Sequence, residues 1–128
     1  MDSAKHTHVF IVDDSVAIRL RLTEMLNAMG DVDIVGEAAE VREAIDGILR
    51  LQPDSVVLDL NLMGRTGIEV MRQVHPRAPK VVFVVLTNHA EPQYRKACAR
   101  AGASYFLDKS RDFERVPQVI AEIAAARP

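Results

Sequence analysis

Short apolar runs alternate with amphipathic segments along the chain, and this alternation is the feature that most limits the possible folds. Strands that are apolar throughout are usually buried on both faces, which is typical of a parallel sheet. The sequence therefore predicts an α/β fold with a five-stranded parallel sheet flanked by five helices. The expected strands are Val9–Asp13, Val32–Ala38, Ser55–Asp59, Val81–Thr87 and Ser104–Lys109.

The segments between these runs carry apolar residues at helical spacing, and most have a clear start or end signal. Ser15 is placed to cap the first helix, and Gly30 and Gly102 follow the ends of two others. Pro117 is compatible with a helix only in its first turn. The expected helices are Ser15–Met29, Glu40–Leu51, Gly67–Val74, Pro92–Ala101 and a last one through Phe113, Val116, Ile120 and Ile123.

Length, charge and cysteine content narrow the class of protein. The 128 residues, of which 48% are hydrophobic and 27% charged, predict a single domain spanning residues 1–128. A net charge of −2 argues against direct binding to nucleic acid or to a membrane surface. The longest apolar run, Val81–Leu86, is far too short to span a membrane, and the single cysteine, Cys98, excludes a disulfide framework. We therefore expect a cytoplasmic domain.

Polar side chains stand at the ends of four predicted strands. Asp13 and Asp14 end the first strand, Asp59 the third, Thr87 the fourth and Lys109 the fifth. In open parallel sheets, ligands bind outside the carboxyl ends of the strands, so these groups are expected to converge. Three aspartates and one lysine sum to −2, which one divalent cation would balance. Oxygen ligands without histidine or cysteine favour Mg²⁺ or Mn²⁺.

This combination of groups suits phosphoryl transfer. An aspartate can act as a nucleophile and form an acyl phosphate. A metal ion and Lys109 would offset the charge on the phosphoryl oxygens, and the Thr87 hydroxyl could donate a hydrogen bond to them.

Four segments, "VDDS", "VVLDLNLMGRTG", "VVLTNHA" and "GASYFLDKS", resemble in order and spacing the signature segments of the response-regulator receiver domain. The resemblance covers the chain from His8 to about Ala126. It implies the flavodoxin-like arrangement with strand order 2-1-3-4-5. It also implies that residues 8–126 form the core of one receiver domain of a two-component signalling system.

The same resemblance assigns a role to each residue of the acidic site. It implies that Asp59 is the phospho-acceptor and that Asp13 and Asp14 are the acidic pair at the Mg²⁺ site. The backbone carbonyl of Asn61, two residues after Asp59, resembles the position that completes the metal ligands. Gly67 matches the glycine eight residues beyond the acceptor.

A switch also follows from the resemblance. Thr87 resembles the switch hydroxyl, Lys109 the lysine that pairs with the phosphoryl group, and Phe106 the aromatic residue that swings inward when Thr87 moves.

The chain departs from the family pattern at three positions. Family members often have proline where this chain has Met63, and many have a proline in a cis bond where it has Ser110. The residue after the switch hydroxyl is usually alanine or glycine, and here it is Asn88. None of these departures removes a chemical group from the site.

The resemblance implies that Asp59 takes a phosphoryl group from a sensor histidine kinase or a histidine phosphotransfer protein. The surface of helix four, strand five and helix five would then bind a downstream effector or form a homodimer. Such a domain catalyses only its own phosphorylation and dephosphorylation, so we do not expect an enzyme acting on a separate substrate.

Two alternatives stay open: the receiver part of a longer DNA-binding response regulator, and an interaction module that works without phosphorylation. An aspartate-nucleophile phosphatase of the haloacid dehalogenase type is disfavoured. That class needs an Asp-x-Asp motif, whereas Asp59 is followed by Leu60 and Asn61.

Overall fold

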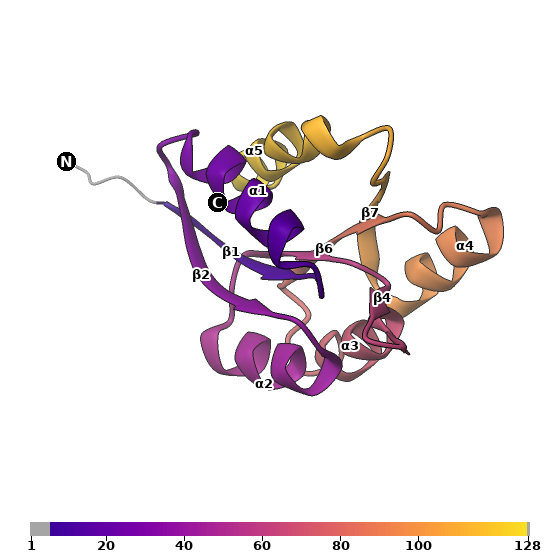
Figure 1. The fold of residues 1–128 in the computed structure, drawn as a ribbon. Coiled ribbons are helices and arrows are strands. Elements are labelled where there is room, and N and C mark those ends of the chain that lie inside the picture. Colours follow the sequence, from indigo (N-terminus) through magenta and orange to yellow (C-terminus); the bar gives the residue numbers. More distant parts are fainter. Residues whose placement is uncertain (1–5, 128) are drawn as a thin grey trace.

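The computed structural model, which describes residues 6–127, contains one five-stranded sheet in which every pair of neighbouring strands is parallel. The strand order is β2-β1-β3-β6-β7 (Figure 1). Because β6 and β7 are the fourth and fifth strands of this sheet, the predicted order 2-1-3-4-5 is confirmed. The strands are β1 (Thr7–Val12), β2 (Val32–Ala38), β3 (Ser55–Leu58), β6 (Val82–Thr87) and β7 (Ala103–Asp108).

Helices cover both faces of the sheet, as expected for a three-layer α/β fold. Figure 1 shows α1 and α5 on one face and α2 and α3 on the other, with α4 beside β7. No helix within residues 6–127 has the length and apolar character needed to cross a membrane. The helices are α1 (Val16–Asn27), α2 (Val41–Leu51), α3 (Gly67–Val74), α4 (Pro92–Ala101) and α5 (Val116–Ala126), with a 3-10 turn at Phe113–Arg115 before α5.

The apolar strands divide their side chains between two separate cores. Val9 and Ile11 of β1 pack with α1 and α5, whereas Phe10 and Val12 pack with α2, α3 and α4. Successive side chains of a strand point to opposite faces, so a continuous apolar run fills both cores at once. This is the physical reason why the strands show no polar alternation in the sequence.

A small hairpin that the sequence analysis did not predict follows β3. Its strands, β4 (Asn61–Leu62) and β5 (Arg65–Thr66), pair antiparallel across a two-residue turn. Both turn residues have positive φ, 53° at Met63 and 85° at Gly64, as a tight hairpin turn with a right-handed strand twist requires. Proline, whose φ is fixed near −65°, could not adopt the backbone conformation that Met63 has here.

Gly47, in the middle of α2, provides a test of the packing between α2 and the sheet. A Cβ atom there would lie 2.8 Å from Cζ of Phe10, whose ring is also bounded by Gly36 on the β2 side. We expect Gly47→Ala to destabilise the domain by about 1–3 kcal/mol, because overpacking outweighs the gain of about 1 kcal/mol in helix propensity. Urea unfolding measures the difference.

The double variant Phe10→Leu/Gly47→Ala serves as the control for this explanation. Removing the ring makes room for the new methyl group, so the two substitutions should couple favourably in a double-mutant cycle. An increase in the free energy of unfolding for Gly47→Ala alone would contradict the packing argument.

Candidate functional site

Backbone pairing brings two of the three aspartates side by side beyond the ends of β1 and β3. Val12 pairs with Leu58 at the last step of the ladder between these strands. The Asp59 N–H then donates to the Val12 carbonyl at 2.9 Å, and the Asp13 N–H donates to Ala38 at 3.1 Å. Both aspartates are therefore fixed by the sheet itself and not by a free loop.

The carboxylates of Asp13, Asp14 and Asp59 form a compact group at this edge. One ligand oxygen from each lies within 4.8 Å of the others, and no other such group of His, Cys, Asp or Glu occurs within the described residues. Asp13 is 2% exposed and Asp59 7% exposed, whereas Asp14 faces solvent. Buried like charges at this separation repel one another strongly, so the group needs a cation.

Lys109 provides part of that positive charge. Its Nζ donates to Oδ2 of Asp13 at 2.8 Å and to Oδ2 of Asp59 at 3.1 Å, and its side chain is 12% exposed. The pKa of Lys109 is raised, because the bonds and charges of Asp13 and Asp59 outweigh the lowering effect of its burial. The net charge of the four groups is still −2.

Asp59 retains an unfavourable charge despite this ion pair. Its pKa is raised above the ordinary value of 3.8, chiefly because burial disfavours the carboxylate, while Asp13 adds to the shift and Lys109 opposes it. A buried carboxylate with excess negative charge around it fits a hard divalent cation such as Mg²⁺.

Further contacts hold the loop after β1, and sequence reasoning missed the most important of them. Nη1 of Arg19 donates to the Asp13 carbonyl at 2.6 Å, and its Nε donates to Glu37 at 3.0 Å. Asp13 Oδ1 also accepts from the Ser15 N–H at 2.9 Å, and Asp14 Oδ2 accepts from the Met63 N–H at 3.1 Å. A cation one helical turn after the Ser15 cap was the available signal for Arg19.

Thr87, the last residue of β6, is fully buried at the same edge of the sheet. Its carbonyl accepts from the Lys109 N–H at 2.8 Å, so Thr87 and Lys109 are tied through the backbone. Its Oγ1 accepts from the His89 N–H at 3.1 Å. Because the oxygen is the acceptor in that bond, the hydroxyl proton is left to donate elsewhere.

Phe106 lies on β7, on the same face of the sheet as Thr87. Phe106 pairs with Val85, and Val85 and Thr87 are two residues apart on β6, so all three point to one side. The ring is partly buried, and the Arg95 guanidinium of α4 lies over it at 4.5 Å from its centroid. The sequence predicted Phe106 at this position but gave no sign of the arginine above it.

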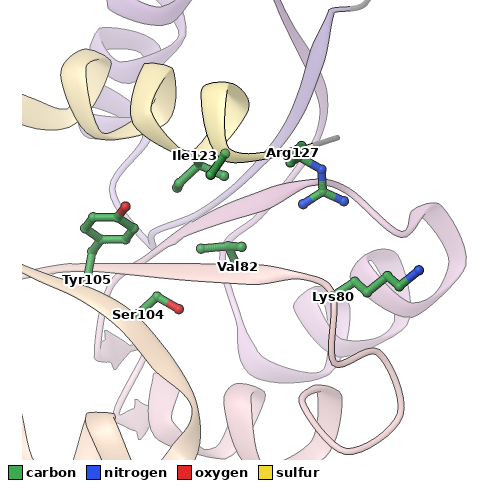
Figure 2. A pocket seen from close by; sticks show the side chains of 7 residues that line it. Lys80, Val82, Ser104, Tyr105, Ile123 and Arg127 are labelled. Carbon is green, nitrogen blue, oxygen red and sulfur yellow. The ribbon is translucent and has the colours of Figure 1, made fainter.

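The predicted site residues, apart from Thr87 and Phe106, surround one hollow of about 270 Å³. A larger hollow of about 560 Å³ lies between β6, β7 and α5, next to Val82, Tyr105 and Ile123 (Figure 2). Since Val82 is the first residue of β6, this second hollow lies at the amino end of the strands, away from the carboxylates. The residues around the smaller hollow are Asp13, Asp14, Ser15, Ile18, Asp59, Asn61, Asn88, His89 and Lys109.

Comparison with known proteins agrees with this geometry. The family model of the response regulator receiver domain matches residues 9–121. This chain belongs to the response regulator receiver domain family. Receiver domains bind Mg²⁺ at an acidic aspartate cluster, and the group of Asp13, Asp14 and Asp59 is a cluster of that kind.

Among its relatives, the receiver is 32% identical over 119 residues to the DNA-binding transcriptional activator DevR/DosR of Mycobacterium tuberculosis. The match covers 93% of this chain and 55% of that protein, so the chain spans about half the length of this relative.

Two solved structures show the same fold. The signal receiver domain of NarL from Mycobacterium tuberculosis matches with a TM-score of 0.88 and 25% identity, covering 97% of this chain and 100% of that one. A chain in the CheX–CheY complex with BeF₃⁻ and Mg²⁺ from Borrelia burgdorferi matches with a TM-score of 0.77 and 25% identity, covering 88% of each.

The raised pKa of Asp59 leads to a stability prediction. A carboxylate whose folded-state pKa exceeds its unfolded value destabilises the fold when ionised, and this penalty disappears as pH falls below about 3.8. In EDTA at pH 7, Asp59→Asn should therefore raise Tm by roughly 4 °C, on the order of 1 kcal/mol. The gain should shrink as the pH falls through the raised pKa of Asp59 and should be absent below about 3.8.

Asp46→Asn is the matched control, because Asp46 is exposed on α2 and pairs only with Arg42 at 3.5 Å. Its Tm should stay close to that of the parent protein at every pH. A lower Tm for Asp59→Asn at pH 7 would mean that the ion pair with Lys109 outweighs the cost of burying the Asp59 charge.

Proposed function

We propose that this receiver accepts a phosphoryl group on Asp59 from a phosphorylated histidine of a sensor kinase or phosphotransfer protein. The observation that carries the proposal is the buried carboxylate of Asp59, bridged to Asp13 by Lys109 at the carboxyl edge of the sheet. Mg²⁺ would be held by Asp13, Asp14, Asp59 and the backbone carbonyl of Asn61, and when bound it would offset the charge on the phosphoryl oxygens.

The transfer is a displacement at phosphorus. A carboxylate oxygen of Asp59 forms a bond to phosphorus as the P–N bond of the donor breaks. The electron pair of that bond stays on the imidazole nitrogen, and the product is an acyl phosphate. Lys109 is already within hydrogen-bond distance of Asp59 and is positioned to pair with a phosphoryl oxygen as the charge moves outward.

Thr87 and Phe106 would link phosphorylation of Asp59 to a change in the conformation of the surface formed by α4, β7 and α5. The free proton of the Thr87 hydroxyl would donate to a phosphoryl oxygen, and Phe106, on the same face of the sheet, would move inward beside it. Hydrogen bonds to charged groups contribute about 1.5–3 kcal/mol each. Two or three approach the roughly 5.5 kcal/mol that inverts a 1:99 equilibrium.

Two different surfaces suit the two kinds of partner. Val16 and Leu20, 61% and 62% exposed, lie one turn apart on α1, and Met63, 69% exposed, lies on the hairpin that bonds to Asp14. Val16 follows Ser15, which lines the acidic hollow, and a phosphodonor protein that reaches Asp59 would dock on these apolar side chains. The surface of α4, β7 and α5, next to Phe106, would bind the effector or a second copy of the chain.

In this role the domain would catalyse only its own phosphorylation and dephosphorylation. It would work in the cytoplasm, without direct contact to DNA or membrane. The similarity to a DNA-binding activator supports the alternative that a receiver of this kind works within a longer regulator. A module that works without phosphorylation is the remaining alternative, and binding of Mg²⁺ would argue against it.

Intact mass spectrometry tests the acceptor directly. After incubation with Mg²⁺ and phosphoramidate, the parent protein should gain one phosphoryl group of about 80 Da, because Asp59 is the buried nucleophile of the site. Asp59→Asn should gain none, and the control Asp46→Asn should behave like the parent protein.

A gain of mass in Asp59→Asn would place the acceptor elsewhere. No gain in any variant, together with no heat of Mg²⁺ binding in calorimetry, would favour the module that works without phosphorylation.

Nuclear magnetic resonance tests the switch. Adding Mg²⁺ and beryllofluoride, an analogue of the phosphoryl group, should shift amide signals of α4, β7 and α5. In Thr87→Ala these shifts should fall by at least half, because the hydroxyl that links the acceptor to Phe106 is missing. If the shifts in the parent protein are confined to amides around the acidic hollow, the switch is contradicted. Asp59→Asn, which should not respond to beryllofluoride, provides the reference.

A further inference from the structure

Among residues 6–127, Lys109 is the side chain that forms an ion pair with both buried carboxylates, yet it belongs to the turn that follows β7. Its ammonium must reach Asp13 and Asp59 at the end of a flexible four-carbon stem. The position of its Cα therefore decides whether the contact forms. Many receivers have a proline after this lysine, whereas here the Lys109–Ser110 peptide bond is trans and Ser110 provides no ring to stiffen the turn.

Two carboxylates close this turn instead. Oδ1 of Asp108 accepts from the Ser110 N–H at 2.9 Å and from the Ser110 hydroxyl at 2.7 Å. Oδ2 of Asp112 accepts from the Asp108 N–H at 3.0 Å, while the Asp112 N–H donates to the Asp108 carbonyl at 2.7 Å. Asp108 and Asp112 are thus bonded to each other in both directions across Lys109.

The turn is also anchored outside itself at both ends. On the sheet side, the Lys109 N–H donates to Thr87 at 2.8 Å. On the helix side, Phe113 is buried, and the guanidinium of Arg21 from α1 lies 4.2 Å from the centroid of its ring. Only residues 110–112 lie between these anchors, so the hydrogen bonds that Asp108 and Asp112 make across them set the path of the backbone next to Lys109.

We propose that Asp108, Ser110 and Asp112 are positioning residues that hold Lys109 against Asp13 and Asp59 through the hydrogen-bonded turn. They touch neither the acceptor nor the donor, and their effect on phosphoryl transfer rests on the proposed function of Asp59. The Ser110 hydroxyl and the Asp108 carboxylate together restrict the turn by a hydrogen bond of 2.7 Å.

The electrostatics of the turn agree with this role. The pKa of Asp108 is lowered chiefly by its bonds from the Ser110 side chain and backbone, and that of Asp112 chiefly by its bond from the Asp108 N–H. Both carboxylates are therefore ionised acceptors at neutral pH, the state in which such bonds are strongest.

The test compares Asp108→Ala with Asp108→Asn by two independent measurements. Asn keeps an oxygen that can accept both Ser110 bonds, whereas Ala keeps none. With saturating Mg²⁺ and phosphoramidate, the phosphorylation rate should fall about tenfold in Asp108→Ala and less than threefold in Asp108→Asn, since a displaced catalytic group costs rate. The Mg²⁺ Kd, which depends on the three acidic ligands, should stay within about twofold.

The second measurement follows the Lys109 ammonium itself in ¹⁵N-labelled, unphosphorylated protein. Its proton signal, assigned by its absence in Lys109→Met, should be present in the parent protein and in Asp108→Asn and lost in Asp108→Ala. Ser110→Ala, which removes one of the two bonds, should give an intermediate loss. Asp54→Ala is the matched control, because Oδ2 of Asp54 accepts from the His8 N–H at 2.7 Å just before β3, at the amino end of the strands and therefore at the opposite edge of the sheet from the site.

A double-mutant cycle separates positioning from general destabilisation. If Asp108 acts through Lys109, Asp108→Ala should slow phosphorylation no further in a Lys109→Met background. Equal rates and an unchanged ammonium signal in Asp108→Ala would overturn the inference, as would an undiminished tenfold effect in the Lys109→Met background. If the parent protein takes up no phosphoryl group but the ammonium signal changes as expected, the proposed function fails and the positioning role stands.

Discussion

The bridge from Lys109 to Asp13 and Asp59 is the interaction on which the rest of this site depends. Without it, three carboxylates would crowd one edge of the sheet with no positive group among them. The bridge compensates only one of the three charges, and burial, together with the charge of Asp13, keeps the pKa of Asp59 raised. A site left partly uncompensated can bind a divalent cation and still retain a nucleophilic oxygen.

Much of the fold followed from the sequence because its signals are local. Continuous apolar runs predicted parallel strands, and the polar residues after them predicted the functional edge. Element ends were less accurate: α1 ends at Asn27, not Met29, and β1 begins at Thr7, two residues before the apolar run. Helix ends and strand starts depend on hydrogen bonds to neighbouring elements, which hydrophobic spacing does not report.

The parts of the site that the sequence did not predict share one physical character. The hairpin turn places Met63 at a positive φ, although methionine has no preference for that conformation. Arg19 binds the carbonyl of Asp13, and Arg95 covers Phe106 from another element. The two arginine contacts exist only after α1 and α4 have packed on the sheet, and the positive φ of Met63 depends on the hairpin that surrounds it. The convergence of the three aspartates and Lys109 could be predicted, but the residues that hold them in place could not.

Arg95 would also allow a partner bound at the α4 surface to influence the acceptor site, which is the reverse of the proposed switch. It is an exposed cation on α4, and it lies over the ring of Phe106, which the proposed switch would move. A partner whose acidic side chain draws Arg95 away from Phe106 would make inward movement of the ring easier. Thermodynamic linkage then requires that such a partner favour the phosphorylated state by the same factor by which phosphorylation favours its binding. Binding of a partner at α4 would therefore promote phosphorylation of the acceptor, just as phosphorylation would promote binding of the partner.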